Sequence, residues 1–239
     1  MISCFFVQII RFFLVFCTKN RRFVPAMDIL SQFKELKKFG YVPVSAGVLQ
    51  SIYGGYKSPN MHIGLLEKRG ALIRLKRGLY AVSPEVTGTD LSLGLIANHL
   101  YGPSYVSLHW ALRFYGLIPE RIETVTSITT RHTREFKTPF GRFTYRGVTR
   151  DYFPIGVKIQ KEDGINYLLA TPEKALCDML LEEKHVPDQS VSALERFFEE
   201  DMRIDIDDIR QMDSSIIHRC MELGNKKQTL KNLLKLIRR

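Results

Sequence analysis

With 239 residues, 45% of them hydrophobic, the chain is long enough to bury the core of one large domain or two small ones. It has 35 Lys and Arg against 25 Asp and Glu, and this net charge of +10 favours anionic partners such as nucleic acid or a membrane surface. The four cysteines form no CxxC motif and have no His at ligand spacing, which argues against a zinc site or a disulfide framework. We therefore predict buried or incidental thiols in a reducing compartment.

The first 26 residues differ in character from the rest. Their apolar run, ISCFFVQIIRFFLVFC, is short for a membrane span, is interrupted by Arg11, and lacks the basic start and cleavage site of a signal peptide. Met27 opens an ordinary soluble sequence, MDILSQFKELKKFG. We predict that translation begins at Met27, that residues 1–26 are a start-site artefact or a disordered leader, and that the protein is cytoplasmic without a membrane partner.

Residues 27–83 predict three short helices followed by a β-hairpin. Apolar residues recur at helical spacing up to Leu36, and Ser45 is placed to cap a second short helix. Ser58 is placed to cap a third helix that starts at Pro59 and ends at Gly70. The runs ALIRL and LYAV then flank a short turn, Lys76-Arg77-Gly78.

This order of elements predicts a winged helix-turn-helix domain that binds DNA, with the third helix in the major groove and the hairpin as the wing. Residues 56–80 hold six basic side chains and one acidic side chain, which suits contact with a polyanion at two points. Lys68 and Arg74 have an alternative role as ordinary surface charges, and His62 has one as a surface or packing residue. The candidate DNA-binding residues are Tyr56, Lys57, Ser58, Asn60, Met61, His62, Lys68, Arg74, Lys76 and Arg77.

The polar segment SPEVTGTD, residues 83–90, predicts a linker to a second domain at residues 90–239. Here we predict helices in LSLGLIANHLYG and in the segment that ends at Gly116, a strand in ETVTSITT, two β-hairpins, and a helix that begins at Pro172. Helices continue to the basic C-terminus. The predicted fold class is therefore α+β, an N-terminal winged helix-turn-helix followed by a second mixed α+β domain with a helical C-terminus.

Charge is unevenly distributed over this second domain. Residues 162–213 hold fifteen acidic and five basic side chains, whereas residues 216–239 hold seven basic and one acidic. We expect Asp178, Glu182 and Glu183 to form a solvated helix face, and the final helix to dock its apolar stripe on the core: Leu230, Leu233, Leu234 and Ile237. A basic run is either solvated surface or a second nucleic-acid or partner surface: Arg131, Arg134, Lys137, Arg142, Arg146 and Arg150.

Motifs of catalytic and cofactor sites are missing from the sequence: GxGxxG, the Walker loop, GxSxG and HExxH. Glu173 and Lys174 in TPEKA are adjacent at a helix start, which capping explains, and lack the strand spacing of a metal-dependent nuclease. We expect no enzymatic activity, no cofactor and no metal ion.

Three segments of the second domain, SYVSLHWALRFYGLIPE, TSITTRHTREFKTPFGRFTYRGV and LLATPEKALCDML, resemble in order the AbiEi-type antitoxins of abortive-infection, type IV toxin–antitoxin systems. The segment LEKRGALIRLKRGLYAV resembles their N-terminal domain, and the similarity covers about residues 28–185. The resemblance implies contacts to DNA from Arg74, Lys76 and Arg77 and from the segment Ser58–His62. The leader before Met27 and the helices after about residue 190 depart from the family pattern.

The resemblance implies a bacterial protein whose winged helix-turn-helix binds repeats in its own promoter and represses the operon. It further implies that the C-terminal domain counteracts a nucleotidyltransferase-type toxin, without a stable complex between the two proteins. We therefore expect a cytoplasmic transcriptional autorepressor and antitoxin that takes part in phage defence.

Two alternatives remain. The first is a protein-binding module whose winged helix is structural and which neutralises a partner by direct contact through the acidic stretch at residues 162–213. The second is a membrane-anchored regulator, which fails if the mature N-terminus is Met27.

Overall fold

The computed structural model describes residues 33–162, 164–187 and 190–238. The predicted leader at residues 1–26 and the predicted start at Met27 lie outside the described residues, as does the beginning of the first predicted helix.

The described residues form helices and two β-sheets, so the fold class is α+β, as the sequence predicts. The first described helical residues are 33–37, and Gly40 follows them with a φ of 53°. Contacts group Leu36–Arg239 into one compact unit. The division into domains at residues 27–83 and 90–239 stays a prediction.

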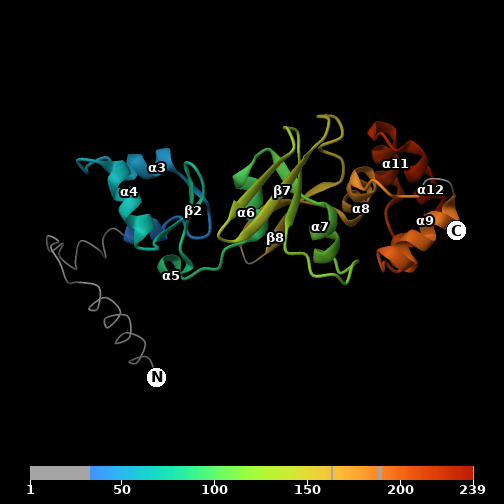
Figure 1. Cartoon of the computed structure of the whole chain (residues 1–239), viewed down its shortest axis with the longest axis horizontal. Helices are drawn as coiled ribbons and strands as arrows, with labels where there is room; N and C mark the ends of the chain where they lie inside the picture. The colour runs from blue at the N-terminus through green and yellow to red at the C-terminus, as the bar shows by residue number, and fades with distance from the viewer. Residues whose placement is uncertain (1–32, 163, 188–189, 239) are drawn as a thin grey trace, which may run out of the picture. The chain divides into compact units, whose positions relative to one another are not determined.

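A three-stranded antiparallel sheet and two helices form the segment that follows Gly40, drawn in blue to green in Figure 1. The strands lie in the order β1-β3-β2, with Val44 opposite Tyr80 and Ile73 opposite Ala81. The predicted hairpin of β2 and β3 is present, but its turn consists of Arg77 and Gly78 alone, because Lys76 belongs to β2. The elements are β1 (Val44–Ser45), α3 (Ala46–Ile52), α4 (Pro59–Lys68), β2 (Leu72–Lys76) and β3 (Leu79–Val82).

Local signals in the sequence set the limits of these elements. Ser45 Oγ accepts a hydrogen bond from the Val48 backbone N–H at 3.3 Å, which caps α3. At the end of α4, Gly70 adopts a φ of 75° and its N–H bonds to the Glu67 carbonyl. Gly78, with a φ of 79°, occupies the hairpin turn. Each of these positions confirms the corresponding sequence prediction.

The segment predicted as a plain linker contains a short helix, α5 (Pro84–Thr87). Ser83 Oγ accepts from the Glu85 N–H at 3.3 Å, and Gly88, with a φ of 73°, ends the turn. The prediction missed this helix because four residues are too few to show an apolar stripe, although the Ser-Pro pair is a helix-start signal.

A six-stranded mixed sheet follows, in the order β6-β7-β5-β4-β9-β8. The hairpins β6–β7 and β8–β9 are antiparallel and confirm the two predicted hairpins, whereas β5 pairs with β7 and β4 with β9 in parallel. The sequence analysis did not predict β4. The strands are β4 (Ser104–Val106), β5 (Val125–Thr129), β6 (Arg134–Thr138), β7 (Gly141–Gly147), β8 (Val157–Glu162) and β9 (Ile165–Ala170).

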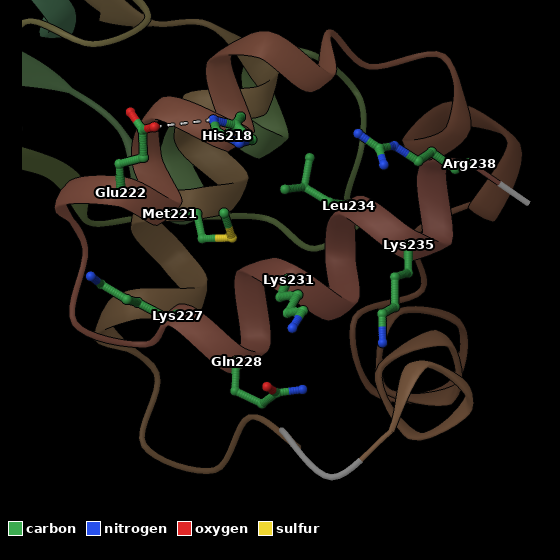
Figure 2. Close-up of a pocket in the computed structure, with 9 residues that line it drawn as sticks. All are labelled: His218, Met221, Glu222, Lys227, Gln228, Lys231, Leu234, Lys235 and Arg238. Carbon is green, nitrogen blue, oxygen red and sulfur yellow. Dashed lines mark ion pairs between the residues drawn. The ribbon is translucent and has the colours of Figure 1, made fainter.

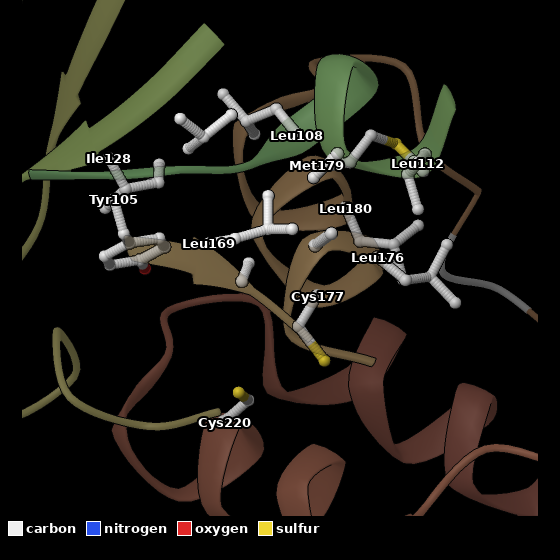
Figure 3. Close-up of a cluster of buried hydrophobic side chains, with 14 of the residues drawn as sticks. Tyr105, Leu108, Leu112, Ile128, Leu169, Leu176, Cys177, Met179, Leu180 and Cys220 are labelled. Carbon is white, nitrogen blue, oxygen red and sulfur yellow. The ribbon is translucent and has the colours of Figure 1, made fainter. Parts of the chain in front are cut away.

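Three helices associate with this sheet: α6 (Leu93–Leu100), α7 (Leu108–Phe114) and α8 (Pro172–Glu182). Thr171 Oγ1 accepts from the Lys174 N–H and caps α8, as predicted. Figure 3 shows Leu176, Met179 and Leu180 of α8 close to Leu112 of α7 in the buried core. Burial of nearly the whole of α8 makes it the central helix of this part of the chain.

The chain ends in a group of short helices: α9 (Val191–Arg196), the π-helical turn η1 (Phe197–Asp201), α10 (Ile206–Arg210), α11 (Ser214–Leu223) and α12 (Lys227–Ile237). In α12, Leu230, Leu233 and Leu234 are buried and Ile237 packs partly buried against the same core. This confirms the predicted docking of the apolar stripe. Cys220 of α11 faces Cys177 of α8 across that core (Figure 3).

Candidate nucleic-acid interface

The first turn of α4 faces outward. Met61 is 74% exposed and Asn60 is exposed next to it. Tyr56 and Lys57, just before the helix, are also exposed, whereas Ser58 is half-buried and its side chain makes no capping hydrogen bond. The turn thus presents an aromatic ring, a cation, an amide and a thioether to solvent.

Asn60 is oriented by a hydrogen bond from the preceding helix. Gln50 Nε2, on α3, donates to Asn60 Oδ1 at 2.7 Å. This bond uses one of the two lone pairs of Oδ1 and leaves the Nδ2 donors of Asn60 available to a ligand. A donor of this kind complements the N7 acceptor of a purine in the major groove.

His62 lies in the interior, on the inner side of the same helix. It is 7% exposed, its ring stacks on Tyr56 with the centroids 4.1 Å apart, and its centroid lies 4.6 Å from that of Tyr53. The structure therefore gives His62 the packing role that the sequence analysis named as its alternative, and makes it a support for the exposed Tyr56 ring.

The hairpin places its basic residues on different sides. Arg77 is exposed at the turn. Arg74 is exposed on β2 but pairs with Glu67 of α4 at 2.6 Å and lies over the Tyr80 ring at 5.5 Å. Lys68, the last residue of α4, is exposed. Among these, Arg77 is the exposed cation in the turn between β2 and β3.

Lys76 points away from the position that the sequence prediction gives it. Its Nζ donates to the Leu100 carbonyl at 2.5 Å and lies 5.7 Å from the centroid of the Phe136 ring. Partial burial, followed by the charges of Arg134 and Arg131, lowers the pKa of Lys76. Lys76 is the last residue of β2, whereas Arg77 lies in the turn that follows and is exposed.

Two arginines of the predicted basic run lie beside Lys76. The guanidinium groups of Arg131 and Arg134 lie 5.6 and 5.8 Å from the centroid of the Tyr101 ring, and both side chains are exposed. By contrast, Arg142 pairs with Glu135 and Arg146 with Glu182, each at 3.3 Å. Within the basic run, the structure therefore separates the arginine pair next to the hairpin from Arg142 and Arg146, which form ion pairs.

Comparisons with protein-family models and with curated proteins find no match to this chain. The resemblance to AbiEi-type antitoxins rests on the sequence segments alone. In the described part of the chain, no helix is long and apolar enough to cross a bilayer.

A buried polar cluster lies on α8, where the sequence analysis predicted a solvated face. That prediction is wrong for Asp178, which is 2% exposed, and Lys174 one turn earlier is fully buried. Lys174 Nζ lies 3.1 Å from Asp178 Oδ1 and 3.1 Å from the centroid of the Tyr152 ring. The physical reason is that α8 is enclosed on nearly all sides, so its polar residues are buried with its leucines.

The acceptors of Asp178 are satisfied within the protein. Tyr105 and Ser107 donate to Oδ2 at 3.0 and 2.6 Å, and Tyr152 donates to Oδ1 at 2.8 Å beside the Lys174 ammonium. Burial and the Asp178 charge raise the pKa of both tyrosines. The acceptor sites of the carboxylate, about four in number, are thereby occupied by groups of the protein itself.

Neither the thiols nor the acids of the described part form a metal site. No group of three or more His, Cys, Asp or Glu side chains in the described ranges is arranged to hold a metal ion. Cys177 and Cys220 are buried free thiols, as the sequence predicts for cysteines in this chain. Burial raises the pKa of the Cys177 thiol.

Proposed function

We propose that the chain is a transcriptional regulator that binds duplex DNA through a winged helix-turn-helix. The order α3, α4, β2, β3, with β1 completing a three-stranded antiparallel sheet, supports this fold. One observation carries the proposal. The exposed first turn of α4 and the exposed Arg77 of the hairpin are the two contact regions that such a domain uses.

The roles of the candidate residues follow from where they lie. Asn60, Met61 and Tyr56 contact base edges or sugars from the first turn of α4. Lys57 and Arg77 contact phosphates, and they supply affinity that depends on salt but not on sequence. Lys76 holds the hairpin against the segment that contains Leu100. Arg131 and Arg134, beside Lys76, extend the basic surface beyond the hairpin.

An operator titration tests the wing. We expect the full chain to bind a duplex of its upstream promoter selectively over a shuffled duplex, and less tightly at the higher of two salt concentrations. Arg77→Ala should weaken binding to both duplexes and reduce the slope of log K against log salt by about 1. Lys161→Ala, which removes an exposed charge from β8, is the matched control. If Arg77→Ala and the control variant have the same slope of log K against log salt, the hairpin does not contact the DNA and this part of the proposal is wrong.

Substitution of Asn60 tests whether this residue contributes to the selection of a DNA sequence. Asn60→Ala should cost about 1–3 kcal/mol on the operator and much less on the shuffled duplex, because it removes a base-edge donor. Gln50→Ala is the control, since it removes the same Gln50–Asn60 hydrogen bond but keeps the Asn60 amide. Equal losses on both duplexes exclude Asn60 as a base reader.

We further infer that this regulator represses its own operon and is the antitoxin of an AbiE-like, type IV system that takes part in phage defence. The support is the resemblance of four sequence segments to the AbiEi-type antitoxins. In this proposal, the part of the chain after residue 90 counteracts a nucleotidyltransferase-type toxin without a stable complex, and the protein works in the cytoplasm.

Co-expression tests this part separately. The full chain should restore the growth of cells that express the toxin encoded in its operon. Arg77→Ala should restore growth equally well while it fails to repress a promoter reporter. Loss of both functions in Arg77→Ala, with the variant still folded, contradicts the assignment of two functions to two parts of the chain.

The alternative, neutralisation by direct contact through the acidic stretch, has less support. Several of its acids act within the protein: Asp205 and Asp213 cap helices, and Glu195 pairs with Arg210 at 3.6 Å. A pull-down with the toxin distinguishes the two functions, because direct neutralisation requires a stable complex and the proposed mechanism does not.

A further inference from the structure

A basic groove runs between α11 and α12, outside the surface proposed to bind DNA. Its volume is about 620 Å³, and Figure 2 shows Met221 and Leu234 between its two walls. One wall is a stripe of four exposed cations, here called the α12 stripe: Lys227, Lys231, Lys235 and Arg238. The facing wall holds one acid, Glu222, which lies 3.5 Å from His218.

The α12 stripe has a regular repeat. Its lysines follow one another at every fourth residue, and four residues of α-helix advance about 6 Å. The side chains therefore form a row of positive charges along one face of the helix. The opposite face is buried through its leucines, so it has no apolar surface left for insertion into a membrane.

The positive charges of the α12 stripe lower the stability of α12 itself. Like charges four residues apart repel each other, and no acidic residue lies within α12 to offset them. Lys227 also stands at the N-terminal end, where the helix dipole is positive. Lys226 differs, because its Nζ donates to the carbonyls of Leu180 and Glu183 and anchors the helix. Violations of local rules without a compensating contact occur mainly at functional sites.

We propose that the α12 stripe binds the phosphodiester backbone of a nucleic acid strand, as a second site distinct from α4 and the hairpin. A regular row of cations complements a polyanion whose charges also repeat regularly. The half-buried Met221 provides an apolar contact for a sugar or base next to that row. This inference goes beyond the proposed function and does not depend on operator recognition.

Charge reversal on the full chain tests the site. Lys231→Glu with Lys235→Glu should weaken binding to an unstructured single-stranded RNA, and to single-stranded DNA of the same sequence, at least 10-fold. The salt slope should fall by about 2, one for each lysine. The control variant, Lys161→Glu with Lys184→Glu, makes the same change in net charge at exposed positions elsewhere and should retain the affinity. Thermal unfolding checks that both variants fold, and Lys231→Gln with Lys235→Gln is the milder second pair.

The outcomes decide between sites and between partners. Equal losses in the α12 and control variants overturn the proposal, because they show a general charge effect. Binding of a polyglutamate peptide that depends on Lys231 and Lys235, without binding of either nucleic acid, also overturns it and makes the partner an acidic protein. Arg77→Ala should leave this binding intact while it weakens operator binding, so failure at one site is distinguishable from failure at the other.

Discussion

At the scale of single residues, the sharpest contrast is between two carboxylates one turn apart on α8. Asp178 accepts hydrogen bonds from three hydroxyl groups and lies 3.1 Å from the buried Lys174 ammonium. Glu182 pairs with Arg146 at the surface, with 38% of its side chain exposed. A buried pair depends on both members, because either one alone is an uncompensated charge in the interior. A surface pair is screened by water and contributes little.

We predict that Asp178→Ala lowers the free energy of unfolding by about 3–5 kcal/mol, because it leaves Lys174 buried without its partner. Glu182→Ala, on the same helix, should change it by at most about 1 kcal/mol. Equilibrium unfolding in urea measures both. The double variant Lys174→Met with Asp178→Leu should lose less than Asp178→Ala alone. Similar values for Asp178→Ala and Glu182→Ala would show that the cluster does not stabilise the fold.

At the scale of secondary-structure elements, the packing of α6 on the six-stranded sheet depends on a glycine. A Cβ at Gly94 would lie 2.4 Å from the Tyr167 ring of β9, and Tyr167 is only 4% exposed, so the ring has little room to move. Gly64, inside α4, has open space around its Cβ position. The two helical glycines therefore serve different purposes. At Gly94, the absence of a side chain lets α6 pack closely on β9. At Gly64, no close contact requires a glycine.

We predict opposite effects for the same substitution at these two positions. Gly94→Ala should lower the free energy of unfolding by about 1–3 kcal/mol, because the added methyl group displaces a buried ring. Gly64→Ala should raise it by about 0.5–1 kcal/mol, because alanine loses less backbone entropy in a helix. Thermal and urea unfolding of the two variants measure the difference. A stabilised Gly94→Ala variant would contradict the packing of α6 on β9.

At the scale of the whole molecule, two neighbouring basic residues of the hairpin, Lys76 and Arg77, have different roles. Lys76 bonds to the Leu100 carbonyl at the end of α6 and lies by Phe136 of β6, so it joins segments that are distant in the sequence. Arg77 is exposed at the turn and makes no such connection in our proposal. The hairpin thus combines a structural cation with an exposed one, which we propose contacts DNA.

We predict that Lys76→Ala lowers the free energy of unfolding by about 1.5 kcal/mol, the low end for a hydrogen bond from a charged donor because the side chain is only partly buried. Arg77→Ala should leave stability within about 0.5 kcal/mol, as expected for a surface substitution. Paired urea unfolding and duplex-binding measurements on both variants test the division. It is wrong if Lys76→Ala reduces the salt slope as much as Arg77→Ala while stability stays unchanged.

The sequence by itself determined the features that depend on residues close together in the chain. Caps at Ser45 and Thr171, left-handed glycines at Gly70 and Gly78, and apolar periodicity in α12 specified α3, α4, α8, α12 and the β2–β3 hairpin, because these signals act within a few residues.

Only the tertiary structure decided which polar side chains are enclosed. The sequence analysis predicted a solvated Asp178. The prediction failed because the elements that bury this residue, α7, α11 and several strands, are distant from it in the chain. The inward positions of His62 and Lys76, the parallel pairing of β4 with β9 and of β5 with β7, and the isolation of the α12 stripe on one exposed face are also non-local. Burial is a property of what packs around a residue, and no short stretch of sequence contains that information.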